Sequence, residues 1–384
     1  MRICLYTETA LPKIGGQEMV VDALARQFQT LGHHVVVFTQ PPRRPLRTND
    51  ETLPYPVVRH PRFLSTRRLV GWYRLWLERL HRRERFDVLH CHSTHPCGYL
   101  AALSKPKLRI PTVITSHGGD VWGKSARLSK PGVRGRHVMA LRSADAVVSI
   151  SRYTTEAYQA LCPGLETLVD IPNGVDLEPF TRQAPPPENL DAAIAPKQYV
   201  LFLGRLNERK GVDVLLHALA SVHPNATNVQ LVIAGDGPAR PALESLTAEL
   251  GLSPRVRFVG AVQGATKTYY LQNALGTVVP SRNWESFGLV VLEGYAAGCP
   301  VVASNLPGLG DLIQVGETGL LVPPESPTAL AAALRTFLDN PAATQAMGAQ
   351  ARNVVKQYAW QEIARRHLLL YETVLAGRTA RASA

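Results

Sequence analysis

Two acidic residues, Glu285 and Glu293, form the pattern in this sequence whose spacing restricts the chemistry most. They lie in the segment PSRNWESFGLVVLEG, where Glu285 follows the apolar run LGTVVP and Glu293 falls on the helix predicted after it. Eight residues of helix separate two side chains by about 80° around the axis and about 12 Å along it. This separation excludes the close carboxylate pair with which glycosidases cleave sugars. Each acid is therefore expected to contact a different part of one elongated ligand. The first backbone amides of that helix should point toward the same ligand: Phe287, Gly288 and Leu289.

A second candidate site lies in the turn GRLNERKG, which covers residues 204–211. It follows the predicted strand YVLFL and precedes the helical pattern VDVLLHALA, so Arg205 and Lys210 lie near the start of a helix. Two cations, backbone amides freed by glycine and the positive end of a helix dipole suit a diphosphate. The alternative is a solvated basic turn. The residues between the two cations are candidates for selecting the ligand: Asn207, Glu208 and Arg209.

Three further turns end predicted strands. The pair Gly15 and Gly16 precedes the first helical pattern and exposes backbone amides, although a plain tight turn explains it equally well. His117, in SHGGD, lies in an open turn and can hydrogen-bond a ligand hydroxyl; the alternative is a buried structural histidine. Asp236, in AGDGP, is predicted to cap the next helix, with Pro238 at its first position. None of these turns has the spacing of a dinucleotide fingerprint or of a G-x-x-x-x-G-K-[ST] phosphate loop.

Metal chemistry is not indicated. The segment LHCHSTHPC contains three histidines and two cysteines, but it lacks the spacings of tetrahedral zinc sites. Its first two histidines, His90 and His92, are predicted to point the same way from a strand. The chain also contains no Asp-x-Asp pair. We therefore predict no metal cofactor. The five cysteines have no framework spacing and are predicted to be free thiols in a reducing compartment.

Short apolar runs alternate with helical patterns along the chain, which is typical of βαβ units around parallel sheets. The alternation stops at residues 181–197, which contain four prolines and are predicted to form a linker. We predict an α/β protein with two Rossmann-like parallel-sheet domains, over residues 1–180 and 198–358, that face each other across a cleft. Ligands of such sheets bind beyond the carboxyl ends of the strands. The last segment, 359–384, has an apolar helical stripe and is predicted to return to the first domain.

The net charge of +12 is concentrated in residues 59–85, which contain nine Arg and two Glu. The helix predicted over 67–85 has one apolar face: Leu69, Trp72, Tyr73, Trp76, Leu77 and Leu80. This face is expected to pack on the sheet, and the alternative is attachment to an anionic membrane surface. With no apolar leader and no run long enough to span a bilayer, we expect a cytoplasmic protein, with the inner membrane face as its alternative location. No nucleic-acid reading motif accompanies the charge.

Taken together and in order, these motifs resemble those of the retaining glycosyltransferases of family 4, which have the GT-B fold. The resemblance covers nearly the whole chain and is carried by GG, SHGGD, NGVD, GRLNERKG, AGDGP, the two glutamates, GCPVVASNLPGLGDLI and TGLLVPP. It implies an enzyme that moves a hexose from a nucleotide sugar to a hydroxyl. The acceptor would be a glycan, a lipid-linked molecule or a small molecule, and no metal or cofactor would be required.

The resemblance also implies roles for individual residues. Arg205 and Lys210 would neutralise the donor diphosphate, and Glu293 would bind the ribose hydroxyls. Glu285, with the amides of residues 287–289, would hold the donor sugar. From the first domain, His117 would contact that sugar, and Gly16 would offer its amide to the phosphate or to the acceptor.

The route of transfer is less constrained by the sequence. No side chain is an obvious nucleophile, so we favour attack of the acceptor from the same face as the departing phosphate, which takes the acceptor proton. Two alternatives share this fold: a nucleotide-sugar epimerase, and a protein that binds nucleotide sugars without catalysis. The four charged residues at positions 205, 210, 285 and 293 argue against the second of these.

Overall fold

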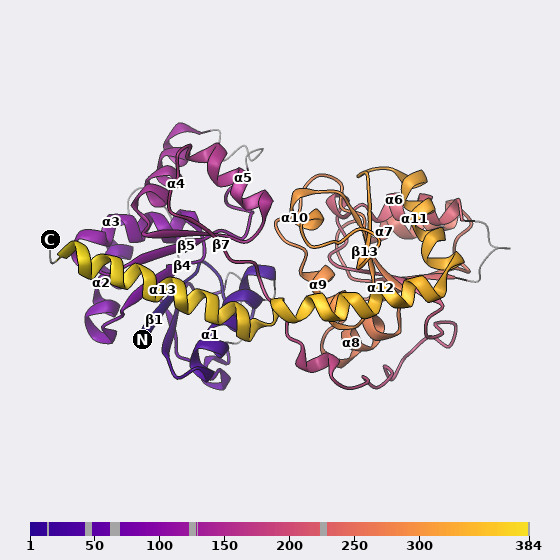
Figure 1. Ribbon diagram of the computed structural model, residues 1–384, viewed down its shortest axis with the longest axis horizontal. Helices are drawn as coiled ribbons and strands as arrows, with labels where there is room; N and C mark the ends of the chain where they lie inside the picture. The colour runs from indigo at the N-terminus through magenta and orange to yellow at the C-terminus, as the bar shows by residue number, and fades with distance from the viewer. Residues whose placement is uncertain are drawn as a thin grey trace. The chain divides into compact units, whose positions relative to one another are not determined.

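The computed structural model describes residues 1–13, 15–42, 48–61, 70–122, 128, 130–222 and 229–382, the last few of these by their backbone only. The chain divides into two compact units (Figure 1). The first comprises Met1–Gly174 and Trp360–Ala384, and the second comprises Val175–Ala359. Each unit is built on its own parallel sheet, which confirms the predicted α/β class with two parallel-sheet domains. No helix in the described part of the chain is long and apolar enough to cross a bilayer.

The sheet of the first unit has seven strands in the order β3-β2-β1-β4-β5-β6-β7. Every neighbouring pair is parallel. The strands are β1 (Arg2–Tyr6), β2 (His34–Thr39), β3 (Val57–Arg59), β4 (Val88–Cys91), β5 (Thr112–Thr115), β6 (Ala146–Ser149) and β7 (Leu168–Asp170). The helices are α1 (Gly16–Thr30), α2 (Val70–Glu84), α3 (Tyr99–Leu108), α4 (Pro131–Ser143), α5 (Arg152–Leu161) and α13 (Trp360–Ala382).

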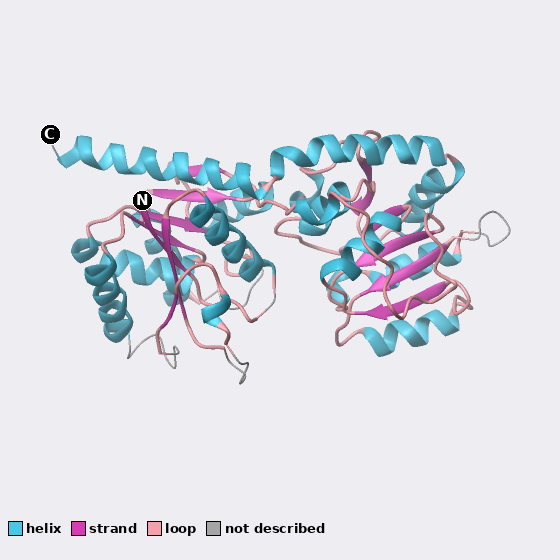
Figure 2. Cartoon of the chain, turned by 90° about the horizontal axis from the view of Figure 1, so that it is seen from below, coloured by secondary structure: helices cyan, strands magenta, loops and turns pink. Residues whose placement is uncertain are grey.

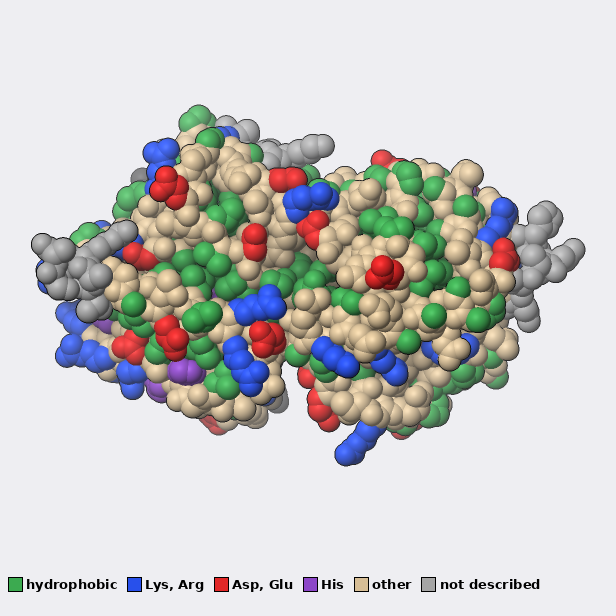
Figure 3. Space-filling model, in the orientation of Figure 1, with side chains coloured by type: hydrophobic (Ala, Val, Ile, Leu, Met, Phe, Trp, Pro, Cys, Tyr) green, Lys and Arg blue, Asp and Glu red, His purple; other side chains and the backbone are tan. Residues whose placement is uncertain are grey.

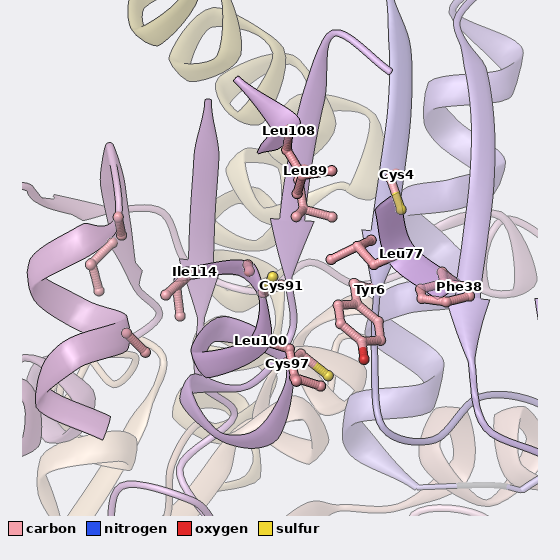
Figure 4. Packing of buried hydrophobic residues seen from close by; sticks show 14 of the residues in the cluster. Cys4, Tyr6, Phe38, Leu77, Leu89, Cys91, Cys97, Leu100, Leu108 and Ile114 are labelled. Atoms are coloured by element: carbon pink, nitrogen blue, oxygen red, sulfur yellow. The ribbon is translucent and has the colours of Figure 1, made fainter. Parts of the chain in front are cut away.

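Helices cover both faces of this sheet because its strands are apolar on both sides. In β1, Ile3 and Leu5 belong to the core on the side of α1 and α13, whereas Cys4 and Tyr6 belong to the core on the side of α2, α3, α4 and α5. Figure 4 shows the second of these cores, where Tyr6 lies beside Phe38. All five cysteines of the chain are buried and unpaired, as predicted.

The last helix, α13, packs on the first unit beside α1 (Figure 1). Its residues Ile363, Ala364 and Tyr371 are completely buried. The ring of Tyr371 lies 5.7 Å from that of Phe28 on α1. The final segment of the chain therefore completes a core whose strands belong to the first 170 residues.

Helix α2 carries the basic segment, and its burial differs in one respect from the prediction. Tyr73, Leu77 and Leu80 are buried, but Trp72 is 60% exposed. The packed residues centre about 100° away from Trp72 around the helix axis, so the tryptophan lies at the edge of the apolar stripe and faces solvent. Leu69 and the rest of residues 62–69 lie outside the described residues.

The sheet of the second unit has six strands in the order β10-β9-β8-β11-β12-β13, and the neighbouring pairs are parallel. The strands are β8 (Tyr199–Leu203), β9 (Gln230–Ala234), β10 (Val256–Gly260), β11 (Gly276–Val279), β12 (Val301–Ser304) and β13 (Gly319–Val322). The helices are α6 (Val212–Ala220), α7 (Arg240–Glu249), α8 (Gly264–Asn273), α9 (Leu289–Ala296), α10 (Pro307–Gly310), α11 (Pro327–Asp339) and α12 (Pro341–Val354). Figure 2 shows these strands between layers of helices. The position that matters most for the site is that of β8, which lies between β9 and β11.

Candidate active site

Two turns of the second unit lie side by side because β8 and β11 are neighbours in the sheet. The turn after β8 carries Arg205 and Lys210, and the loop after β11 carries Glu285. Gly211 has φ +65°, and a Cβ atom there would lie 2.1 Å from the carbonyl oxygen of Pro280. Only glycine therefore lets the two turns approach this closely.

Lys210 and Glu285 form an ion pair within these turns. Glu285 is buried, and its Oε1 atom also accepts a hydrogen bond of 2.6 Å from the hydroxyl of Ser281. Burial by itself raises the pKa of this carboxyl, but the charges of Lys210 and Arg209 outweigh it and hold the pKa below its ordinary value. The carboxylate is therefore ionised at neutral pH. Lys210, which was predicted to bind the diphosphate, is thus in direct contact with Glu285, which was predicted to bind the sugar.

Arg209 clamps the same two turns together. Its guanidinium lies 4.2 Å from the ring centroid of Trp284 and donates a 2.8 Å hydrogen bond to the carbonyl oxygen of that residue. Its own carbonyl oxygen accepts a hydrogen bond from the amide of Arg282. The side chain of Arg282 is held in turn by Asp213 and Glu325. Sequence reasoning left Arg209 without a defined role, since its partners lie on another strand's loop.

Arg205 differs from Lys210 in that it is exposed, and its guanidinium makes no hydrogen bond or ion pair with a described residue. The predicted amides of the next element are also available. The N-terminus of α9 follows Gly288, and no described residue accepts a hydrogen bond from the amides of Phe287, Gly288 or Leu289. A cation and three amides are therefore available for an anionic or hydroxylated ligand at the carboxyl ends of β8 and β11.

Glu293 lies on α9 and is paired with a lysine that sequence reasoning missed. Its Oε1 atom is 2.7 Å from Nζ of Lys267, which lies on α8. Because this pair uses only Oε1 of Glu293, the Oε2 atom remains available to hydroxyl donors. Asp236 does not cap a helix, contrary to the prediction: α7 begins at Arg240, and Asp236 accepts a hydrogen bond from the amide of Gly237 instead.

In the first unit, Gly16 is the first residue of α1 and follows Gly15, whose backbone is extended. The side chain of Glu18 is buried beneath this turn and accepts hydrogen bonds from Thr9 and Lys13, the latter at 2.7 Å. Glu18 therefore fixes the chain that leads into α1, a role that the sequence analysis did not assign.

His117 follows β5 and is half-buried. Its Nε2 atom lies 3.1 Å from Nδ1 of His92, and the planes of the two rings are 11° apart. Burial lowers the pKa of His117 to about 4, so the imidazole is neutral at pH 7. The loop is further held by Asp120, which accepts hydrogen bonds from the amide and hydroxyl of Thr94 and from the hydroxyl of Ser116.

The His-rich segment 89–97 contributes to this network and does not converge on one point. His90 and His92 lie on the same side, as predicted, with ring centroids 4.3 Å apart. Their ring nitrogens contact the hydroxyls of Thr115 and Tyr371 and the ring of His117. Within the described ranges, no group of three or more His, Cys, Asp or Glu side chains is arranged to hold a metal ion.

Two Rossmann-like sheets, with cations and acids gathered at the strand ends of the second, define a glycosyltransferase of the GT-B type, and comparison with known proteins agrees. The family model described as Glycosyltransferase Family 4 matches residues 14–179, and the model described as Glycosyl transferases group 1 matches residues 191–354. The chain belongs to glycosyltransferase family 4, which confirms the predicted family and enzyme class.

Individual relatives give the same result. A phosphatidyl-myo-inositol mannosyltransferase of Mycobacterium tuberculosis is 34% identical over 298 residues, which cover 75% of this chain and 74% of the relative. An uncharacterized glycosyltransferase of Methanocaldococcus jannaschii is 28% identical over 397 residues, covering 98% and 99% of the two chains. The crystal structure of HepE from Anabaena in complex with UDP has the same fold, with a TM-score of 0.81, 20% identity and coverage of 97% and 100%.

Proposed function

We propose that this glycosyltransferase moves a hexose from a nucleotide sugar to an acceptor hydroxyl, with retention of anomeric configuration and without a divalent metal. The observation that carries the proposal is the arrangement at the ends of β8 and β11, where Lys210 is paired with Glu285 and Arg205 has no partner among the described residues. Two cations at the carboxyl end of a strand in a parallel sheet suit a diphosphate. The structural relative HepE was also solved in complex with UDP-glucose, which supports a nucleotide-sugar donor.

In the second unit, Arg205 and Lys210 are assigned to the donor diphosphate. Glu285 is assigned to the donor sugar, together with the amides of residues 287–289. The free Oε2 atom of Glu293 is assigned to the ribose hydroxyls, with Lys267 holding the carboxylate in place through Oε1.

In the first unit, the family resemblance assigns His117 to the donor sugar. The amide of Gly16, at the start of α1, is assigned to the phosphate or to the acceptor. His117 is held by the buried His92, and the buried Glu18 accepts hydrogen bonds from Thr9 and Lys13 in the segment that precedes Gly16.

Transfer of a glycosyl group passes through an oxocarbenium-like state while the diphosphate leaves with growing negative charge. Arg205 and Lys210 stabilise that charge without a metal because the turn after β8 carries both cations at the end of the strand. The acceptor hydroxyl attacks from the face that the phosphate leaves, and the phosphate takes its proton. This route gives retention without a protein nucleophile.

The donor is identified by calorimetry with UDP-, GDP- and ADP-sugars. We expect one nucleotide series to bind, and we expect the sugar to add affinity over the nucleoside diphosphate alone. Incubation of that donor without acceptor then separates the enzyme classes: an epimerase releases an isomerised nucleotide sugar, and a transferase does not. Absence of binding to all three series would overturn the proposal.

The cations are tested by Arg205→Ala and Lys210→Ala. Each variant should lose about tenfold or more in kcat, because each removes stabilisation of the leaving group. Lys356→Ala is the matched control, since Lys356 is a solvent-exposed lysine of the same unit whose Nζ donates a hydrogen bond to Asn353. Normal kcat in both site variants would contradict the assignment. The proposal that transfer needs no metal would be contradicted if excess chelator abolished transfer and added divalent metal restored it.

We further propose that α2 attaches the enzyme to an anionic membrane surface. The solvent-facing side of this helix combines two exposed apolar side chains, Trp72 at 60% and Leu75 at 52%, with the exposed Arg79, Arg82 and Arg83. Figure 3 shows basic side chains gathered where Figure 1 places α2. Both acids of the helix are paired with cations: Glu78 with Arg74 of the same helix and with Lys107, and Glu84 with Arg2, His34 and the neighbouring Arg83.

Flotation with vesicles tests this surface. The full chain should float with vesicles that contain anionic phospholipid and remain behind with zwitterionic ones. The variants Trp72→Ala/Leu75→Ala and Arg79→Glu/Arg83→Glu should each lose the association. A charge-matched variant on α13, Arg365→Glu/Arg366→Glu, should retain it. Equal recovery with both lipid compositions, or unchanged flotation of the α2 variants, would refute membrane attachment.

A further inference from the structure

A column of four histidine rings runs through the interior of the first unit from α13 to the candidate site. The ring centroid of His367 on α13 lies 5.5 Å from that of His90, that of His90 lies 4.3 Å from that of His92, and that of His92 lies 5.4 Å from that of His117, with ring planes 11° apart. His90, His92 and His367 are buried. Three of these rings have no contact with a ligand in the proposed function, so their arrangement requires an explanation of its own.

The proton positions on His90 follow from its two partners. Its Nδ1 atom is 2.6 Å from the hydroxyl of Tyr371, and its Nε2 atom is 2.7 Å from the hydroxyl of Thr115. Among the described residues, the hydroxyl of Tyr371 has this one hydrogen-bond partner, so it must donate to Nδ1 or leave its own proton unpaired in the core. His90 therefore carries its proton on Nε2 and donates to Thr115, at the end of β5, two residues before His117.

The proton on His92 is placed by a similar argument. Its Nε2 atom is enclosed and has no hydrogen-bond partner within the described part of the chain, whereas its Nδ1 atom is 3.1 Å from Nε2 of His117. An enclosed N–H group without an acceptor costs more than an enclosed lone pair without a donor. His92 therefore carries its proton on Nδ1 and donates it to Nε2 of His117.

The hydrogen bond from His92 determines which nitrogen of His117 carries the proton and can donate to a ligand. Since Nε2 of His117 accepts from His92, the single proton of the neutral ring must lie on Nδ1. The Nδ1 atom makes no hydrogen bond to a described residue and is not among the enclosed, unpaired atoms. It is therefore the nitrogen that a ligand can reach.

We propose that His92 is a positioning residue that fixes His117 in the Nδ1–H tautomer, so that His117 donates a hydrogen bond to a hydroxyl oxygen of the donor sugar. The sugar as the recipient rests on the function proposed above, whereas the tautomer does not. Burial favours the neutral forms of all four histidines, which lowers the pKa of His117 and His367 to about 4 and those of His90 and His92 well below the ordinary value. A neutral column imposes one tautomer without placing a charge beside the site.

Nitrogen-15 NMR of the full chain tests the tautomer directly. The imidazole resonances of His117, assigned by comparison with His117→Ala, should show a protonated Nδ1 and an unprotonated Nε2 at neutral pH. His92→Asn keeps a donor at the position of Nδ1 and should preserve this pattern. His92→Phe keeps an aromatic ring without the donor and should lose it. A protonated Nε2 on His117 in the unmodified protein would overturn the proposal, whether or not any nucleotide sugar binds.

Binding measurements test the consequence for the donor. The ratio between the affinities of the nucleotide sugar and of its nucleoside diphosphate reports the contacts made to the sugar alone. His92→Phe should reduce this ratio roughly tenfold, and His92→Asn should restore most of it, with the affinity for the diphosphate unchanged. His60→Phe is the matched control, because His60 is equally buried in this unit but packs against Tyr6 and Phe38. A ratio unchanged in His92→Phe, or reduced equally in the control, would refute the positioning role.

Discussion

Lys210 and Glu285 form an ion pair although 75 residues separate them in the chain. The side chain of Lys210 is 19% exposed and that of Glu285 is 9% exposed, so each compensates a charge that is largely removed from water. A donor diphosphate that reaches Lys210 must therefore share the ammonium group with the carboxylate or replace it. Replacement frees hydrogen-bonding capacity on Glu285 at the moment when the donor arrives.

The first prediction concerns Glu285→Gln. Removing the carboxylate charge leaves Lys210 without its counter-ion, so the affinity for the nucleoside diphosphate alone should rise severalfold. The additional affinity contributed by the sugar should fall, and kcat should fall by about tenfold or more. Calorimetry with both ligands and steady-state assays measure these effects. Weaker binding of the diphosphate in this variant would contradict the competition between the carboxylate and the phosphate.

The second prediction concerns Arg209, whose side chain fixes the loop that carries Glu285. Arg209→Ala should lower kcat by about tenfold and destabilise the second unit by about 1 kcal/mol, since a cation–π contact and a hydrogen bond are lost. Arg209→Lys should recover little of either, because lysine lacks the planar group that stacks on Trp284. Arg240→Ala is the control: Arg240 also lies over an aromatic ring, that of Phe258, but its guanidinium pairs with Glu244 of α7 and makes no contact with Trp284. Full activity in Arg209→Ala would show that the clamp is dispensable.

The third prediction concerns Glu293. Glu293→Ala should weaken binding of the ribonucleoside diphosphate by roughly tenfold and leave binding of its 2′,3′-dideoxy analogue nearly unchanged, because the lost contacts are those to the hydroxyls. Glu249→Ala, on α7 of the same unit, should alter neither. If both ligands lose affinity equally in Glu293→Ala, the carboxylate acts on some other part of the donor.

The fourth prediction concerns the acid stability of the first unit. Burial lowers the pKa of the histidines in the column, to about 4 for His117 and His367. The unfolded chain therefore binds protons at these positions at a higher pH than the folded chain does. The stability that the neutral histidines contribute is fully present above about pH 6.5 and is lost as the pH falls toward 4. Unfolding midpoints measured across this range should fall less steeply in His92→Asn than in the unmodified protein. A parallel decline in the two proteins would contradict this account.

The sequence was informative wherever one local segment carried the signal. The apolar runs predicted the strands of both sheets except the short β3. Glu285 was correctly predicted to lie in a loop and Glu293 on the helix after it, but α9 begins only at Leu289, so the eight residues between the two acids are not all helical. The turns containing Arg205 and Lys210 were likewise predicted to follow a strand. Each of these inferences requires only the neighbours of a residue in the chain, and local periodicity reports those neighbours well.

The partners of these residues were not predicted, and the reason is the order of the strands. Arg209 meets Trp284 because β8 adjoins β11, and Lys267 meets Glu293 because α8 packs near α9. No periodic pattern in the sequence indicates which strands or helices are neighbours in the fold. The exposure of Trp72 was missed for a different reason: an apolar stripe on a helix predicts a face about 100° wide or more, but not which edge of it packs.

The return of α13 to the first unit has a consequence for folding during synthesis on the ribosome. The strands of the first sheet are synthesised within the first 170 residues, but Ile363, Ala364 and Tyr371 complete the core on one of its faces. Until these residues emerge, apolar side chains under α13, including Phe28, lack their cover. The unit that is translated first is therefore the one whose folding finishes last, after the second unit has already left the exit tunnel.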